Sequence, residues 1–434
     1  MDKMADVLGR AGAWCGQNKY LSAIKNAFQN FMPLTIAGAI GVLWCNVLVN
    51  DQTGLGLFFK PIMALDFLNP AFQAVNFCTI SCITVGITLG IAQEIGVWNM
   101  GAEKAGYIPG LVGLAAWLSV TNTSHMVEGA KEAFTGIAGN ELGATGLFTG
   151  MIIGVLSVEL FCFFEKQDAL KIKMPEQVPP GVARAFEVLV PATITLIITA
   201  CIGSACYNLT GLYLNDVIKN GIQGPLGAVG ATIPGVMIIY LVIMLFWLVG
   251  IHGNNMLSAV KEALFTPLAL ENVEKFNKGE KPTNIINMYF LQMCGEFGGS
   301  GVTIGLVIAI MIFGKREDNK AIASLSLVPG LFNINETVTF GIPMVLNPIL
   351  GIPFVFACLV TILVGYVLTV IGFCPVACLT VPWTTPPIVF GFLACGANVM
   401  GAVTQAILIV VSTVIYTPFL ISYEKYQNKQ AAEA

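Results

Sequence analysis

Long runs of apolar residues alternate with short polar connectors along most of this 434-residue chain. A helix needs about 20 mostly apolar residues to cross the hydrocarbon core of a bilayer. The pattern therefore predicts an all-α polytopic membrane protein with roughly eight to ten spans. The candidate spans are residues 31–49, 73–93, 107–120, 143–164, 187–209, 228–250, 300–314, 349–372, 379–396 and 400–421.

Three of these runs, 107–120, 300–314 and 379–396, are short or interrupted by Gly and Pro. Irregular backbone at membrane depth is tolerated only where it is buried in protein or lines a cavity. We therefore expect re-entrant hairpins or broken helices at these places, because an ordinary span would be longer and unbroken.

The composition agrees with a membrane class. Only 11% of residues are charged, whereas a soluble domain has about 25%, and 56% are hydrophobic. The net charge of −4 argues against a nucleic-acid binder, which normally carries a basic face. The 12 cysteines lie mostly in apolar runs and form no paired CxxC pattern, so we expect buried free thiols, no metal and no cofactor.

The connectors carry most of the basic residues. Residues 165–186, residues 315–320 and the tail 423–434 contain Lys or Arg, and the positive-inside bias predicts that they face the cytoplasm. Residues 1–20 have no apolar core of a signal peptide and predict an interfacial helix. Residues 256–284 predict an amphipathic hairpin that reaches water.

Ionisable residues embedded in apolar context, and Asn-rich patches, concentrate after about residue 225. This change predicts a scaffold half, residues 1–225, followed by a substrate half, residues 226–422, and a cytoplasmic tail, residues 423–434.

His252 stands at the end of a strongly apolar run, with Asn254 two residues later. An ionisable group in this position is costly and usually faces a cavity, so we expect a functional role for it, with Asn254 as a substrate contact. The alternative is a neutral histidine bonded to a backbone carbonyl. The second histidine, His125, lies in a polar stretch and is expected in a loop.

A carboxylate and two amides interrupt the apolar stretch 332–343, with helix breakers on both sides. Asn333, Asn335 and Glu336 would suit a ligand rich in hydroxyl groups, since amides and carboxylates accept hydrogen bonds. Burial would raise the pKa of Glu336 toward neutrality, which suits a general base. The alternative is a structural glutamate that bonds backbone amides of a hairpin.

Two further residues are candidate sugar contacts. Glu296 lies in a glycine-rich segment, 294–301, and could accept from a sugar hydroxyl or instead only pack a hairpin. Trp383 lies in the Pro-rich segment 381–387 and could stack on a sugar ring, or belong to the aromatic belt of the membrane interface. A GxxxxGK[ST] nucleotide motif is absent.

Taken together, the sequences GIHGNN at 250–255, GGSG at 298–301 and FNINE…FGIP…LNP at 332–348 are similar to a known family. The chain resembles, over essentially its whole length, the membrane-embedded IIC component of the bacterial phosphoenolpyruvate-dependent sugar phosphotransferase system. The branch it resembles carries lactose, cellobiose or diacetylchitobiose. Where that family most often has Pro after the Glu, this chain has Thr337.

The resemblance implies ten transmembrane helices with two re-entrant hairpins, assembled as a homodimer in the bacterial cytoplasmic membrane. It implies that a β-linked disaccharide enters from outside and leaves inside as its 6-phosphate. The phosphoryl donor would be a phosphocysteine on a separate IIB protein. By the same resemblance, Glu336 and His252 lie nearest the 6-hydroxyl, and Asn335 and Trp383 contact the sugar.

One rival function uses the same residues. In a proton-coupled secondary sugar transporter, Glu336 and His252 would relay a proton that is coupled to sugar movement. Residue chemistry alone does not separate the two functions, and the motif match favours the phosphotransferase component.

Overall fold

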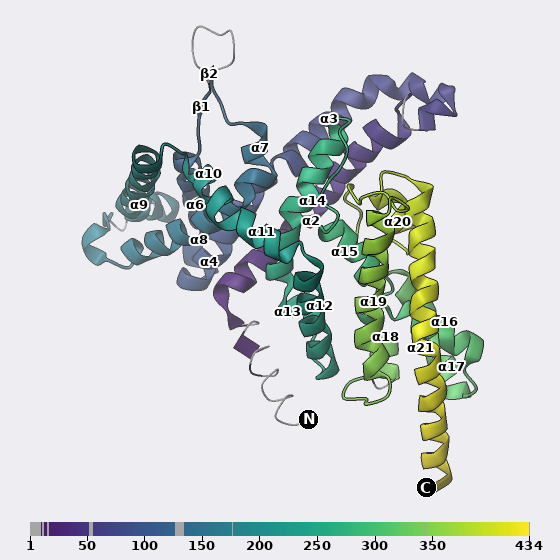
Figure 1. Ribbon diagram of the computed structural model, residues 1–434. Coiled ribbons are helices and arrows are strands. Elements are labelled where there is room, and N and C mark those ends of the chain that lie inside the picture. The colour runs from purple at the N-terminus through teal and green to yellow at the C-terminus, as the bar shows by residue number, and fades with distance from the viewer. Residues whose placement is uncertain are drawn as a thin grey trace. The chain divides into compact units, whose positions relative to one another are not determined.

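We describe the protein from a computed structural model (Figure 1). The structure describes residues 17–51, 55–125, 134–175, 177–342 and 344–433, together with Arg10, Ala13 and Trp14. Pro343 of the FGIP sequence and most of the predicted N-terminal interfacial helix lie outside the described residues.

Nearly all regular structure in the described residues is helical. The helices are α2 (Lys19–Leu43), α3 (Asn69–Asn76), α4 (Ile83–Met100), α5 (Ala102–Ala105), α6 (Ile108–Val120), α7 (Gly139–Leu142), α8 (Ala144–Glu165), α9 (Pro180–Thr210), α10 (Leu214–Ile218), α11 (Gly224–Gly230), α12 (Ile233–Leu248), α13 (Gly253–Met256), α14 (Ser258–Asn277), α15 (Met288–Gly295), α16 (Ile304–Phe313), α17 (Glu317–Leu331), α18 (Glu336–Gly341), α19 (Gly351–Val370), α20 (Val389–Ala394) and α21 (Val399–Glu433). Short 3₁₀ or π turns occupy Trp44–Leu48, Leu55–Leu57, Lys60–Leu68, Phe77–Ser81, Asp168–Leu170, Lys219–Gln223 and Ser300–Val302.

The strands found among the described residues form one small hairpin. β1 (Ser124–His125) pairs antiparallel with β2 (Phe134–Thr135). His125 was expected in an irregular loop, and it lies instead in this two-residue strand, where its ring is 5.6 Å from the ring of Phe134.

The chain divides into two compact units. The N-terminal unit contains Gln17–Gly38 and Val75–Gly227, and the C-terminal unit contains Ala39–Ala74 and the described residues from Ala228 onward. Residues 39–74 therefore group with the later part of the chain, although the composition of the sequence changes only near residue 225. The division into scaffold and substrate roles remains a proposal.

Helices α4, α6 and α8 pack against one another in the core of the N-terminal unit. Small residues allow this close approach: a Cβ added to Gly113 of α6 would lie 2.3 Å from the Cβ of Ala92 in α4. Glycine at such contacts is characteristic of helices packed within membranes, where the gain comes from van der Waals contact between backbones.

Helix length and composition agree with a multi-pass membrane protein. Among the described residues, five helical segments can cross a membrane: Lys19–Leu48, Ala144–Glu165, Pro180–Thr210, Gly351–Val370 and Val399–Gln430. Two bent pairs raise the number to seven if each is one span: Lys60–Ser81 with Ile83–Met100, bent by 42°, and Met288–Val302 with Ile304–Phe313, bent by 59°. The apolar helices Ile108–Val120 and Ile233–Leu248 are shorter, so the count of ten spans stays a prediction.

Two of the three interrupted runs, 300–314 and 379–396, take irregular forms. The expectation is wrong for 107–120, which forms the single continuous helix α6, because its proline, Pro109, lies in the first turn, where proline is accommodated. The 59° bend falls within the glycine-rich segment before 304, where Gly298, Gly299 and Gly301 adopt positive φ. In the run 379–396, only α20 is helical, and the residues before it are extended or in turns.

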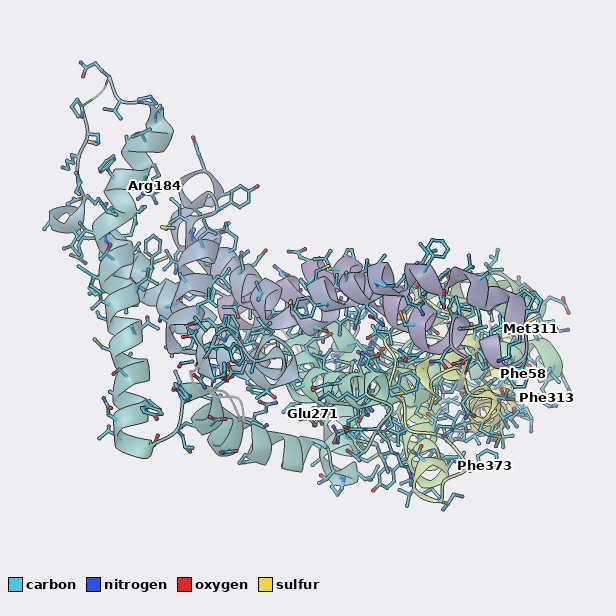
Figure 2. The ribbon with its side chains drawn as sticks, turned by 90° about the horizontal axis from the view of Figure 1, so that it is seen from above. Phe58, Arg184, Glu271, Met311, Phe313 and Phe373 are labelled. Atoms are coloured by element: carbon cyan, nitrogen blue, oxygen red, sulfur yellow. The ribbon has the colours of Figure 1, made fainter. Side chains whose placement is uncertain are left out.

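Many large apolar side chains point outward, as lipid contact requires. Phe58, Met311 and Phe313, labelled in Figure 2, are exposed. The described cysteines are free thiols, and Cys358, Cys374, Cys378 and Cys395 are buried as expected. Cys78 and Cys201, however, are exposed, because they lie on outward faces of their helices.

Helix α21 organises the C-terminal unit. It packs against α16, α19 and α20, and α19 in turn packs against α12 and α15. Figure 1 shows α19 and α21 running alongside each other. The predicted boundary at residue 422 is not a structural break, because α21 continues as helix to Glu433.

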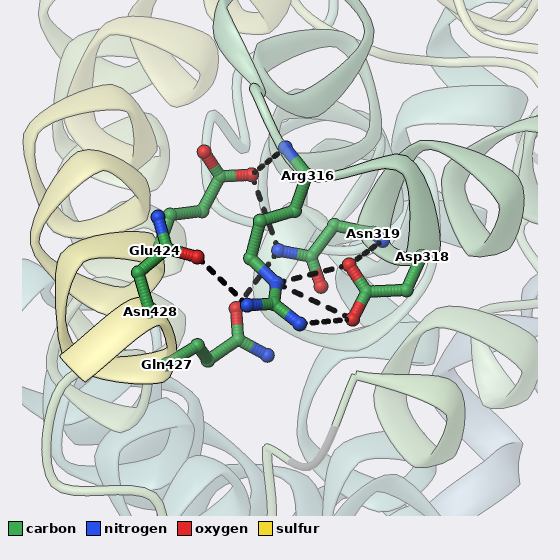
Figure 3. Close-up of polar contacts among 6 residues, drawn as sticks. All are labelled: Arg316, Asp318, Asn319, Glu424, Gln427 and Asn428. Carbon is green, nitrogen blue, oxygen red and sulfur yellow. Dashed lines mark hydrogen bonds and ion pairs between the residues drawn. The ribbon is translucent and has the colours of Figure 1, made fainter. Parts of the chain in front are cut away.

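A polar cluster, which we call the Glu424 clamp, joins the end of α21 to the start of α17 (Figure 3). The buried Glu424 carboxylate accepts from the backbone N–H groups of Lys315 at 2.8 Å and Arg316 at 3.3 Å, and from Nδ2 of Asn319 at 3.2 Å. The Arg316 guanidinium also donates to Asp318 and lowers the pKa of that carboxyl. This ion pair therefore persists to more acidic pH than an unpaired aspartate would allow.

We expect Glu424→Ala to destabilise the protein by about 2–4 kcal/mol, because it removes a buried carboxylate that accepts from three donors at a helix N-terminus. Thermal unfolding of the purified protein in detergent measures the loss. Glu424→Gln keeps one acceptor oxygen and should lose less. Equal melting temperatures for Glu424→Ala and the parent would contradict the clamp.

Candidate functional site

Asn333 joins three separate turns of the C-terminal unit. Its Oδ1 accepts from the backbone N–H of Gly298 at 2.6 Å, and its Nδ2 donates to the carbonyl oxygens of Trp383 and, at 3.1 Å, Thr385. Its backbone has φ of 63°, a conformation that asparagine tolerates better than most residues. Both Nδ2 hydrogens are occupied, so Asn333 acts here as a tie between turns.

Asn335 is a second tie, buried behind the glycine turn. Its Nδ2 donates to the carbonyl of Ser300 at 2.8 Å. Gly299 has φ of +88°, and a Cβ there would lie 2.6 Å from the Cβ of Asn335. Glycine is therefore required at position 299 both for its backbone conformation and for the space that Asn335 occupies.

Glu336 begins α18 and is exposed, so the expected burial of this carboxylate is wrong. No hydrogen bond or ion pair from the described residues holds its carboxylate, so the alternative role of capping a hairpin finds no support in these contacts. Thr337, also exposed, follows it in the first turn, where proline is normally well accommodated. The Glu336 carboxylate is therefore free to accept a hydrogen bond or a proton from a ligand hydroxyl group.

His252 caps the short helix α13. Its Nδ1 accepts from the backbone N–H of Asn255 at 3.3 Å, and its ring lies 4.4 Å from that of Trp247. An accepting Nδ1 places the proton of the neutral ring on Nε2, which can then donate. Among the charged side chains close enough to influence this ring electrostatically are Glu336, Lys261 and Glu296.

Asn254, two residues further on, has its Oδ1 buried without a hydrogen-bond partner among the described residues. A buried acceptor of this kind is costly unless a donor reaches it, and a ligand hydroxyl would supply one. Trp383 is 44% exposed, and its carbonyl is held by Asn333. Its ring is therefore available while its backbone is fixed.

Glu296 is held by two residues that the sequence did not single out. Its Oε1 accepts from the Tyr240 hydroxyl at 2.7 Å and from the Lys261 ammonium group. The expected amphipathic hairpin at 256–284 is wrong for its first part: α14 is one helix over Ser258–Asn277, and it buries Lys261. A lone lysine in a mixed polar segment gave no sequence signal of burial.

A second carboxylate lies beside this ion pair. Glu262 accepts from the Thr266 hydroxyl at 2.5 Å. The hydroxyl groups of Tyr289, on α15, and Thr380, in the segment between α19 and α20, are 2.5 Å apart. The described residues place no group of three or more His, Cys, Asp or Glu side chains where they could hold a metal ion. The site is thus a concentration of hydroxyl, amide and carboxylate groups inside an apolar unit.

Comparison with known proteins identifies the family. Residues 25–358 match the family described as "Phosphotransferase system, EIIC". The oligo-beta-mannoside-specific EIIC component of Bacillus subtilis (strain 168) is 33% identical over 429 residues, covering 98% of this chain and 94% of the relative. The lactose-specific EIICB component of Staphylococcus aureus (strain COL) is 32% identical, covering 94% of this chain and 69% of the relative.

A solved structure agrees with these relatives. The crystal structure of the transporter ChbC, the IIC component from the N,N'-diacetylchitobiose-specific phosphotransferase system, matches with a TM-score of 0.88 and 29% identity. The match covers 97% of each chain. The resemblance read from the motifs is therefore confirmed, and this multi-pass membrane protein belongs to the phosphotransferase system EIIC family, the sugar permeases of that system.

Proposed function

We propose that the protein carries a β-linked disaccharide, of the cellobiose, lactose or diacetylchitobiose type, across the bacterial cytoplasmic membrane and releases it as the 6-phosphate. The names of the relatives, which include a cellobiose-specific EIIC component of Lactococcus lactis subsp. lactis (strain IL1403), support this substrate class. The observation that carries the proposal is the exposed Glu336 carboxylate at the start of α18, for which the described residues supply no hydrogen bond or ion pair.

The proposed chemistry is a phosphoryl transfer from a phosphocysteine of a IIB protein. The sugar 6-hydroxyl oxygen attacks phosphorus in line, and the phosphorus–sulfur bond breaks to release a cysteine thiolate. Glu336 takes the hydroxyl proton, and the Nε2–H of His252 donates to the same oxygen to orient it. Catalysis here consists mainly of positioning, since the transferring group needs little covalent help.

The remaining polar residues would bind the sugar. Asn254 offers an unpaired acceptor, Glu296 a carboxylate oxygen and Trp383 an exposed ring, while Asn333 and Asn335 fix the turns that carry them. We further propose a homodimer formed by the N-terminal half, and docking of the IIB protein at the connectors 165–186 and 315–320. The second connector begins the Glu424 clamp, so its backbone is held rigidly.

Membranes containing this chain, supplied with the soluble phosphotransferase proteins and phosphoenolpyruvate, test the function. We expect sugar phosphate to form from at least one β-linked disaccharide in a screen of that class. In vesicles, accumulation that stops when the proton gradient collapses, with no sugar phosphate formed, would favour the rival secondary transporter and overturn the proposal.

A further inference from the structure

A buried ion pair lies within the candidate site but outside the reacting groups. Lys261 is 6% exposed, and its ammonium group contacts the Glu296 carboxylate. The two residues come from different elements, α14 and the end of α15, and Tyr240 comes from a third, α12. Three helices of the C-terminal unit thus converge on one carboxylate.

Both contacts fall on the same oxygen. The Tyr240 hydroxyl and the Lys261 ammonium group donate to Oε1 of Glu296, and no described residue donates to Oε2. The Glu296 side chain keeps 17% of its surface exposed, whereas Tyr240 is fully buried. The ammonium group also lies 5.6 Å from the centre of the Tyr240 ring, a cation–π distance that fixes the lysine as well.

A carboxylate gripped by one oxygen has lost its freedom to rotate. Removing one member of a buried ion pair is strongly unfavourable, so the lysine also prevents Glu296 from moving toward solvent. The free oxygen then points in a set direction at little further entropic cost when a ligand binds. Such preorganisation makes a hydrogen bond to one particular hydroxyl selective.

We propose that Lys261 and Tyr240 are positioning residues that hold Glu296 by Oε1, so that Oε2 accepts a hydrogen bond from one hydroxyl of the bound sugar. This inference rests on the proposed function, and it assigns to the buried trio the affinity for the sugar and the choice among sugars. Lys261, Tyr240 and Glu296 take no part in the phosphoryl transfer itself. That step is proposed for Glu336 and His252.

Kinetics of sugar phosphorylation in membranes of the full-length protein, with phosphorylated IIB protein in excess, provide the test. We expect Lys261→Met to raise KM for the sugar about 10- to 100-fold, with kcat changed by no more than about threefold. Lys261→Arg should recover most of the affinity, and Tyr240→Phe should raise KM about three- to tenfold. Lys278→Met is the matched control, since Lys278 pairs with Glu274 in an exposed ion pair, and it should leave KM unchanged.

The double variant Lys261→Met/Glu296→Gln separates positioning from simple charge balance. Its site is neutral, so amounts of folded protein should return to those of the parent while KM stays raised. If the double variant restores the parental KM, or if Lys261→Met leaves KM unchanged, the positioning role is wrong. If Lys261→Met does not accumulate, Tyr240→Phe and the double variant decide the question in the same way.

A binding measurement keeps this inference distinct from the phosphotransferase proposal. The thermal shift produced by cellobiose, lactose or diacetylchitobiose is compared in the parent, Lys261→Met and Tyr240→Phe proteins without any IIB protein. A sugar-dependent shift that weakens in both variants supports positioning, even if no sugar phosphate forms. An undiminished shift in both variants overturns it, even if phosphorylation proceeds normally.

Discussion

Glu336→Gln should still bind sugar but lose phosphorylation, with kcat lowered by about 10²- to 10⁴-fold, the range for removing a general base. The amide keeps the size and one acceptor oxygen of the side chain, so the turn at 332–336 should stay in place. It cannot take the hydroxyl proton as the oxygen attacks phosphorus. The measurement pairs sugar-phosphate formation with a sugar-dependent thermal shift in the same membrane or detergent preparation.

The matched control is Glu274→Gln. Glu274 lies in α14, outside the proposed site and docking connectors; its side chain is 44% exposed and forms an ion pair with Lys278. This variant should phosphorylate sugar at the parental rate. Normal phosphorylation by Glu336→Gln would remove the general-base role and leave Glu336 as a binding residue at most.

Asn333→Ala should destabilise the protein strongly, by about 3–5 kcal/mol. It removes the acceptor for Gly298 and the donor for Trp383 and Thr385, and it leaves those backbone groups without partners. It also places alanine at a φ of 63°, which is unfavourable for a residue with a Cβ. Thermal unfolding in detergent gives the loss, and sugar phosphorylation should fall with it.

Two companion variants separate these causes. Asn333→Gly loses the same hydrogen bonds but accepts the backbone conformation, so it should be about 1 kcal/mol more stable than Asn333→Ala. Asn122→Ala, which removes only an exposed local bond to the backbone of Ser124, should leave unfolding unchanged. Equal stability of Asn333→Ala and the parent would show that the three turns are not joined through this side chain.

The sequence alone determined the class of the protein and indicated which residues to propose for the reaction. Apolar runs of membrane length, and a content of charged residues of only 11%, predict an all-helical membrane protein. In lipid, the backbone polar groups of such runs are satisfied by hydrogen bonds within a helix. The same scarcity singled out His252 and Glu336 as candidates, since a titratable group within an apolar stretch of sequence is costly and is a functional hypothesis by default. The interruptions at 300–314 and 379–396 marked irregular backbone for the same reason.

Only the tertiary structure decided how the polar residues divide their work. Asn333 and Asn335 were expected to contact the sugar. Their side-chain amides instead donate hydrogen bonds to backbone carbonyls up to 52 residues away in the sequence. Lys261 lies beside Glu296 because α14 buries it against α12, and no local pattern in the sequence encodes that contact. Residues 39–74 belong to the C-terminal unit. Helix α21 continues past residue 422, and its Glu424 carboxylate accepts a hydrogen bond from the backbone just before α17. Hydropathy reports the preference of each residue for lipid or water. The burial and the hydrogen-bond partners of a side chain, however, depend on segments that are distant in sequence, and only tertiary packing brings these segments together.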